Sequence, residues 1–212
     1  MIEPIVRMID VSKKFGDKIV FDKLNLEILP GEFVTITGKS GSGKSTLLNM
    51  LGLLDTCDHG MIEIFKETNI KPFSSKATKI LRNKIGYLFQ NFALVQNESV
   101  LYNMEIAIKH YKISNQSNLI KEALSSVGLS GYEDKMIYHC SEGEQQRIAI
   151  ARLLIKPCDL ILADEPTASL DTENKGEILR LLKKMNNEGK TIVIVTHDLS
   201  LLDISERNVH IG

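Results

Sequence analysis

Residues 32–54 read EFVTITGKSGSGKSTLLNMLGLL, and this stretch decides the fold. It starts with a short apolar and β-branched run, passes through glycine and serine, and ends in apolar residues at helical spacing. The middle part fits the pattern GxxxxGK[ST], in which backbone N–H groups and a helix N-terminus cradle phosphate oxygens. Strand, glycine loop and helix in this order predict an α/β domain that binds a phosphate-bearing ligand.

Two side chains of this loop predict direct roles in binding. Lys44 can reach the β- and γ-phosphates of a nucleotide, and the Ser45 hydroxyl can ligate magnesium. The pattern therefore predicts a nucleoside triphosphate with Mg2+. The candidate phosphate-binding residues of the loop are Gly38, Lys39, Ser40, Gly41, Ser42, Gly43, Lys44, Ser45 and Thr46.

The sequence on either side of this loop changes character twice. Residues before it alternate apolar and polar in short pieces, which predicts β-structure. Residues 158–212 hold short buried runs joined by a helical pattern, which predicts a parallel sheet. We expect one domain over residues 1–212, with a β-rich and phosphate-loop lobe (1–90), an inserted helical lobe (91–157) and a return to the α/β core.

Polar residues end three of the predicted strands. The run LILADEP ends in Asp164 and Glu165, whose side chains point to opposite sides of a strand and so differ in role. One carboxylate can hold Mg2+ through its water shell, and the other can poise a water for attack on the γ-phosphate. Gln90 in YLFQN and His197 in VTHD end comparable runs, at the edge where open α/β sheets bind ligands.

The stretch CSEGEQQR at residues 140–147 predicts a helix start. Ser141 can cap the helix, and Glu144 can reach back to the Ser141 N–H in a capping box. This pattern alone leaves open whether the stretch only begins a helix or also forms half of a reaction site.

The bulk composition excludes several classes of protein. With 26 basic and 27 acidic residues, the net charge of -1 does not favour nucleic acid or an anionic membrane surface as a partner. Cys57, Cys140 and Cys158 form no CxxC pair, which suits a reducing cytosol. No apolar run is long enough for a membrane helix, and the N-terminus does not resemble a signal peptide. We therefore expect a cytoplasmic chain without direct membrane insertion.

The motifs GKSGSGKST, YLFQN, CSEGEQQR, LILADEP, SLD and VTHD, in this order, resemble the nucleotide-binding domain of ABC transporters over essentially the whole chain. The resemblance implies a P-loop NTPase core with a mainly parallel sheet, an N-terminal antiparallel β subdomain and an inserted helical subdomain. It also implies an ATPase that binds ATP and Mg2+ as a homodimer. In this family the stretch at CSEGE is the signature motif, which faces the ATP held by a second copy.

The resemblance implies a role for each remaining candidate residue. Those roles are Asp164 and Gln90 for Mg2+, Glu165 as the general base, His197 for steadying the γ-phosphate and the attacking water, Phe15 for stacking on adenine, Ser141 and Gly143 for the partner copy's γ-phosphate, and Asp171 for coupling the two sites. Gln90 would also touch the membrane partner, and residues 92–94 would lie under its cytoplasmic helix.

The signature motif departs from the family pattern at two positions. Cys140 replaces a leucine, and Glu142 replaces the first glycine. A carboxylate within about 5 Å of a triphosphate repels it by roughly 1 kcal/mol per unit charge in bulk water, and by more where the pair is desolvated. We favour the interpretation in which Glu142 points away and complements the helix dipole, with slow turnover as the alternative.

The family resemblance predicts a peripheral subunit on the cytoplasmic face of the membrane that drives a separate transmembrane permease. LNMLGLLD and QNFALVQNESV are similar to stretches of the lipoprotein-release, macrolide and bacteriocin exporters. Two alternatives stay open, which are a regulator of a cell-division or cell-wall complex and an ATP sensor with little hydrolysis. A third, a soluble DNA-repair or translation ATPase, is disfavoured because such proteins usually need long insertions or two fused cassettes, and neither fits this sequence.

Overall fold

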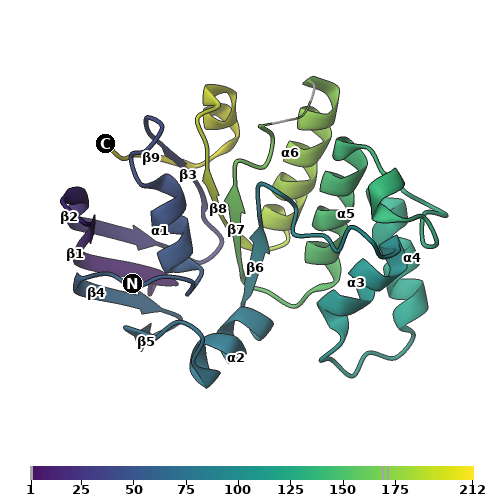
Figure 1. Cartoon of the computed structure of the whole chain (residues 1–212), viewed down its shortest axis with the longest axis horizontal. Helices are drawn as coiled ribbons and strands as arrows, with labels where there is room; N and C mark the ends of the chain where they lie inside the picture. The colour runs from purple at the N-terminus through teal and green to yellow at the C-terminus, as the bar shows by residue number, and fades with distance from the viewer. Residues whose placement is uncertain (1, 169, 171) are drawn as a thin grey trace.

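The protein is described here by a computed structural model that covers residues 2–168, 170 and 172–212, without the side chains of residues 172, 173, 199 and 200. Its centre is a five-stranded sheet in the order β6-β7-β8-β3-β9, with every neighbouring pair parallel (Figure 1). The strands are β3 (Phe33–Thr37), β6 (Ile85–Leu88), β7 (Leu160–Asp164), β8 (Thr191–Val195) and β9 (Arg207–His210).

A second sheet of four antiparallel strands lies at the N-terminal side (Figure 1). Its order is β2-β1-β4-β5, and β1 and β2 form a hairpin around Gly16, which has a positive φ of 57°. The strands are β1 (Val6–Phe15), β2 (Lys18–Ile28), β4 (His59–Ile64) and β5 (Glu67–Thr68). The parallel sheet and this antiparallel sheet confirm the predicted fold class.

Helices cover the two faces of the parallel sheet with two separate cores. On β7, Leu160 and Leu162 pack in one core with α1 (Lys44–Leu51), whereas Ile161 and Ala163 face the other. This second core holds α5 (Glu142–Ile155) and α6 (Thr172–Asn187). Figure 1 shows α1 and α5 on different sides of β7. Because side chains alternate along a strand, both faces of β7 are apolar, as expected for a sheet covered by helices.

The segment between β6 and β7 is helical. It contains α3 (Val100–Ile108), α4 (Gln116–Ser126), the short η1 (Ile137–His139) and α5, and no strand among the elements of these described residues. The sequence analysis did not anticipate β4, β5 or α2 (Ser75–Asn83), and η2 (Leu199–Ile204) precedes β9. Within the part of the chain that the structure describes, no helix combines the length and the apolar character needed to cross a membrane.

Candidate nucleotide-binding site

The loop between β3 and α1 can be built only with glycine at two positions. A Cβ at Gly38 would lie 2.1 Å from the Ile211 carbonyl oxygen. Gly43 has a φ of 98°, and its Cβ would lie 2.4 Å from Val20. The α1 helix starts at this glycine with no side-chain cap and no acidic residue in its first turn. Its first N–H groups are therefore left for an anion from outside the helix.

Lys44 lies inside this loop. Its ammonium group donates to the carbonyl oxygens of Gly38 at 2.8 Å and Lys39 at 3.1 Å, and the residue is buried. A buried ammonium held by two neutral carbonyls is poised to exchange them for charged phosphate oxygens. A second lysine borders the loop, because Lys18 of the β1–β2 hairpin donates to the Gly41 carbonyl oxygen. The sequence analysis missed Lys18, which belongs to no loop motif.

Ser45 and Asp164 meet at the carboxyl end of β7. The Ser45 hydroxyl donates to Asp164 Oδ1 at 3.3 Å. Burial raises the pKa of Asp164, the hydrogen bond from Ser45 opposes this, and the nearby charge of Glu165 adds to the rise. Asp164 also lines an open cavity of about 810 Å³ together with Gln90 and Glu142. The structure thus brings Ser45, Asp164 and Gln90 to one edge of the sheet.

Glu165 has different surroundings from its neighbour, as predicted for adjacent residues at a strand end. Its backbone leaves the strand with a positive φ of 47°, and its carboxylate accepts the Thr196 hydroxyl at 2.8 Å. The same carboxylate accepts the His197 N–H at 3.1 Å and lies 2.8 Å from His197 Nδ1. His197 leaves most of its side chain exposed. The end of β8 therefore fixes Glu165, and Thr196 is a contributor that sequence analysis missed.

Phe15 lies at the exposed end of β1. The residue is 54% exposed, with the Lys13 ammonium 5.1 Å from the ring centroid. The hairpin that follows Phe15 reaches the phosphate loop through Lys18. An exposed aromatic ring beside a phosphate loop is available for stacking on a nucleotide base.

The signature stretch folds as the predicted capping box. The Ser141 hydroxyl accepts the Glu144 N–H at 3.2 Å, and Glu144 accepts the Ser141 N–H at 2.7 Å. Glu144 also accepts the Tyr132 hydroxyl at 2.6 Å and the Lys135 ammonium at 3.0 Å. Burial favours a higher pKa for Glu144, but these three donors outweigh it and lower the pKa to about 2. Glu144 is therefore ionised at neutral pH and holds the start of α5 in place.

Gly143 and Glu142, two further residues of the signature stretch, differ in their surroundings. A Cβ at Gly143 would lie 3.2 Å from the Asn174 side chain, so the start of α5 closely approaches the start of α6. Glu142 is exposed. Asp171, the candidate coupling residue, lies outside the described residues.

The phosphate loop and the signature turn are separate half-sites within one chain. The loop continues into α1, and the signature turn into α5, and these helices pack on opposite faces of the parallel sheet. No hydrogen bond joins the two half-sites in the described ranges. The two helix N-termini are therefore not joined by hydrogen bonds within one chain, although Glu142 lines the same open cavity as Asp164 and Gln90.

Comparison with known families identifies this arrangement. A family model described as ABC transporter matches residues 21–168. The chain belongs to the ABC transporter family. It is an ATP-binding cassette and an ATPase of that family, with the fold that ABC ATPases share.

Relatives of this ABC cassette include curated proteins and solved structures. The lipoprotein-releasing system ATP-binding protein LolD of Bacteroides fragilis is 40% identical, over 97% of each chain. The macrolide export ATP-binding/permease protein MacB of Bordetella avium is 37% identical over the whole chain, which spans only 33% of MacB. A dimeric post-hydrolysis structure of MJ0796 from Methanocaldococcus jannaschii, bound to ADP and Pi, matches with a TM-score of 0.88 and 38% identity over 98% of this chain and 94% of MJ0796.

Proposed function

We propose that two copies of this cassette hydrolyse Mg–ATP between them and drive a separate transmembrane permease. The observation that carries this proposal is the placement of the two half-sites on helices that pack on opposite faces of the sheet. A second copy, turned to present its α5 N-terminus to the phosphate loop, completes each site. The related cassette MJ0796 is described as a dimer bound to ADP and Pi, which supports this assembly.

In this proposal the phosphate loop and the residues next to it bind Mg–ATP. Lys44 leaves the carbonyl oxygens of its own loop to contact the β- and γ-phosphates, and Phe15 stacks on adenine. Ser45, Asp164 and Gln90 supply oxygen atoms at one sheet edge, which is the ligand type that Mg2+ prefers. These residues would hold Mg2+, which would supply positive charge next to the phosphates. No three His, Cys, Asp or Glu side chains of the described residues cluster as a metal site, which suits an ion that also takes phosphate and water ligands.

Hydrolysis falls to Glu165 and His197. The Thr196 hydroxyl and the His197 N–H orient the Glu165 carboxylate, which accepts a proton from the attacking water. The His197 ring is mostly exposed although its Nδ1 lies 2.8 Å from Glu165, so its exposed side can contact the γ-phosphate and steady that water. We propose that Ser141 and Gly143 of the second copy contact the γ-phosphate, and that Asp171 couples the two sites.

The membrane side of the proposal rests on the relatives. MacB is named as an ATP-binding/permease protein, and this chain matches 33% of its length. LolD is named as an ATP-binding protein of a lipoprotein-releasing system. We propose a peripheral position on the cytoplasmic face of the membrane, with export of a peptide, bacteriocin, lipoprotein or drug. Residues 92–94 are the proposed permease contact, made through the exposed Ala93, because Phe92 and Leu94 are buried in the core of this chain. Arg152 braces the segment by donating to the carbonyl oxygens of Phe92 and Ala93.

Affinity capture from solubilised native membranes tests the permease coupling. The tagged Glu165→Gln chain, held in its ATP state, is expected to retain a transmembrane protein that mass spectrometry identifies. The tagged Lys44→Ala chain is the matched control with weakened nucleotide binding. Recovery of soluble proteins alone, with ATP present, would leave a soluble dimeric ATPase and contradict the permease proposal.

A further inference from the structure

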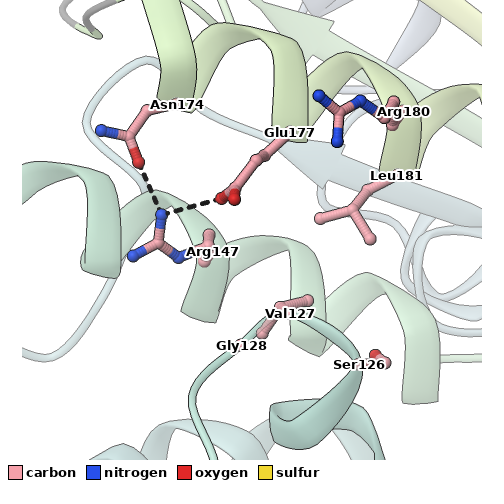
Figure 2. Close-up of a pocket in the computed structure, with 8 residues that line it drawn as sticks. All are labelled: Ser126, Val127, Gly128, Arg147, Asn174, Glu177, Arg180 and Leu181. Carbon is pink, nitrogen blue, oxygen red and sulfur yellow. Dashed lines mark hydrogen bonds and ion pairs between the residues drawn. The ribbon is translucent and has the colours of Figure 1, made fainter.

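A cavity outside the nucleotide site lies where three helices meet. It has a volume of about 550 Å³ and is bounded by the turn after α4, by α5 and by α6 (Figure 2). Arg147 of α5 and Arg180 of α6 both line it, and Figure 2 shows Glu177 between them. Val127 and Leu181 give it an apolar side.

The side chains that line this cavity have more N–H donors than acceptors to pair with them. Nη1 of Arg147 donates to Asn174 Oδ1 at 2.6 Å and to Glu177 Oε2 at 3.2 Å. The Nε–H of Arg147 is buried and has no hydrogen-bond acceptor among the residues that the structure describes. A buried donor without an acceptor is unfavourable, so the Nε–H of Arg147, unlike its Nη1, is left unsatisfied within the described part of the chain.

The charges are also unbalanced. Glu177 pairs with Arg147, whereas the exposed Arg180 makes no hydrogen bond or ion pair within the described part of the chain. Among the described residues that line the cavity, two guanidinium groups therefore stand beside one carboxylate, which pairs with Arg147. These described lining residues leave one positive charge without a negative partner.

We propose that this cavity binds a carboxylate group. Guanidinium groups present their N–H donors in a planar fork that matches the two oxygens of a carboxylate, and the pair of arginines offers such donors from two helices. Val127 and Leu181 accommodate the short aliphatic stem that carries the group. The carboxylate comes either from a small organic acid or from an acidic side chain of a peptide segment.

Occupation of this cavity acts on the signature turn. Arg147 and Gly143 lie four residues apart on α5 and so share a helix face. Asn174 contacts both, as the acceptor of Arg147 and as the neighbour 3.2 Å from a Cβ built on Gly143. A carboxylate that draws Arg147 toward Arg180 shifts the contact that supports Gly143. This consequence, unlike the binding itself, rests on the proposed function of the signature turn.

Side-chain NMR of the full chain tests the binding directly. The chain is labelled with 15N and saturated with ADP, which fills the phosphate loop, and is titrated with glutarate or with the peptide acetyl-Ala-Glu-Ala-amide. We expect a saturable shift of the Arg147 Nε–Hε signal with at least one probe. The exposed variant Arg180→Ala should weaken this binding at least tenfold, whereas Arg82→Ala, an exposed arginine on α2, should leave it unchanged.

The outcomes distinguish a small organic acid from a protein segment as the source of the carboxylate. They also test the binding separately from its effect on the signature turn. Tighter binding of glutarate assigns the site to a small organic acid, and tighter binding of the peptide assigns it to a protein segment. No saturable shift with either probe, or an equal response from Arg180→Ala, overturns the proposal. Binding without any change in ATP-dependent dimerisation overturns only the link to the signature turn, and loss of that dimerisation in the untreated protein would instead count against the proposed function.

Discussion

The two helix N-termini of the proposed ATP site are built in opposite ways. The α1 helix begins at Gly43 with no side-chain cap and no acidic residue in its first turn. The α5 helix begins with a complete capping box, and both Glu142 and Glu144 lie in its first turn. An anion can therefore bind at the start of α1 without displacing a side chain, whereas the start of α5 already carries two carboxylates.

This difference indicates a division of labour. The phosphate loop is prepared to bind nucleotide in a single chain, with the buried Lys44 hydrogen-bonded to two carbonyl oxygens of its own loop. The signature turn is held rigid by Glu144, Tyr132 and Lys135, and so offers a fixed surface instead of an independent anion site. The first half-site should therefore control ATP affinity, and the second should control closure of the dimer.

Replacing the general base should give the largest effect. In Glu165→Gln the amide cannot accept a proton from water, and general base catalysis contributes about 10²- to 10⁴-fold to rates. We expect steady-state ATP turnover to fall by that factor while ATP binding persists. A coupled ADP-release assay measures the first and equilibrium dialysis the second. Turnover within threefold of the unchanged protein would remove Glu165 from this role.

Removing the lysine of the phosphate loop should weaken ATP binding in the monomer. Hydrogen bonds to charged groups contribute about 1.5–3 kcal/mol, and 1.4 kcal/mol corresponds to a factor of ten. Lys44→Ala should therefore bind ATP about 10- to 100-fold more weakly by fluorescence titration. Lys79→Ala, an exposed lysine of α2, is the control and should bind normally. Equal affinities would contradict the loop assignment.

The glycines of the two half-sites should differ in how much unfolding free energy the protein loses when alanine replaces them. At Gly43 an alanine would have a positive φ and a 2.4 Å clash with Val20, which together should cost about 2 kcal/mol or more of unfolding free energy. At Gly143 the nearest atoms are the flexible end of Asn174, at 3.2 Å, and alanine favours the helix. We expect Gly143→Ala to change stability by less than about 1 kcal/mol. Urea unfolding of both variants measures the contrast, and equal losses would contradict it.

Neutralising the unusual signature carboxylate should give the smallest effect. Glu142 is exposed and lines the same cavity as Gln90 and Asp164. If its carboxylate points away from the partner's ATP, Glu142→Gln should change turnover by less than about fivefold, since an interaction below about 1 kcal/mol corresponds to less than that factor. A rise above tenfold would instead show that Glu142 repels the triphosphate and slows the enzyme.

The sequence predicted the parts of the site that depend on local patterns. Glycine spacing indicated the phosphate loop, and Ser141 with Glu144 indicated the capping box that the structure contains. Contacts between distant segments could not be predicted in this way. Lys18 reaches Gly41 across a hairpin, and Tyr132 reaches Glu144 across a turn, and neither contact leaves a periodic signal. The short strands β4 and β5 were missed because they contain few consecutive apolar residues.

Dimerisation with ATP tests most directly whether the signature turn acts on the nucleotide of a second copy. Light scattering should show that the Glu165→Gln chain doubles in mass when ATP is added. The double variant Glu165→Gln with Ser141→Arg should bind ATP with unchanged affinity and stay at the mass of one chain, because the arginine side chain obstructs the signature turn. A double variant that still forms the ATP-dependent dimer would contradict the composite site.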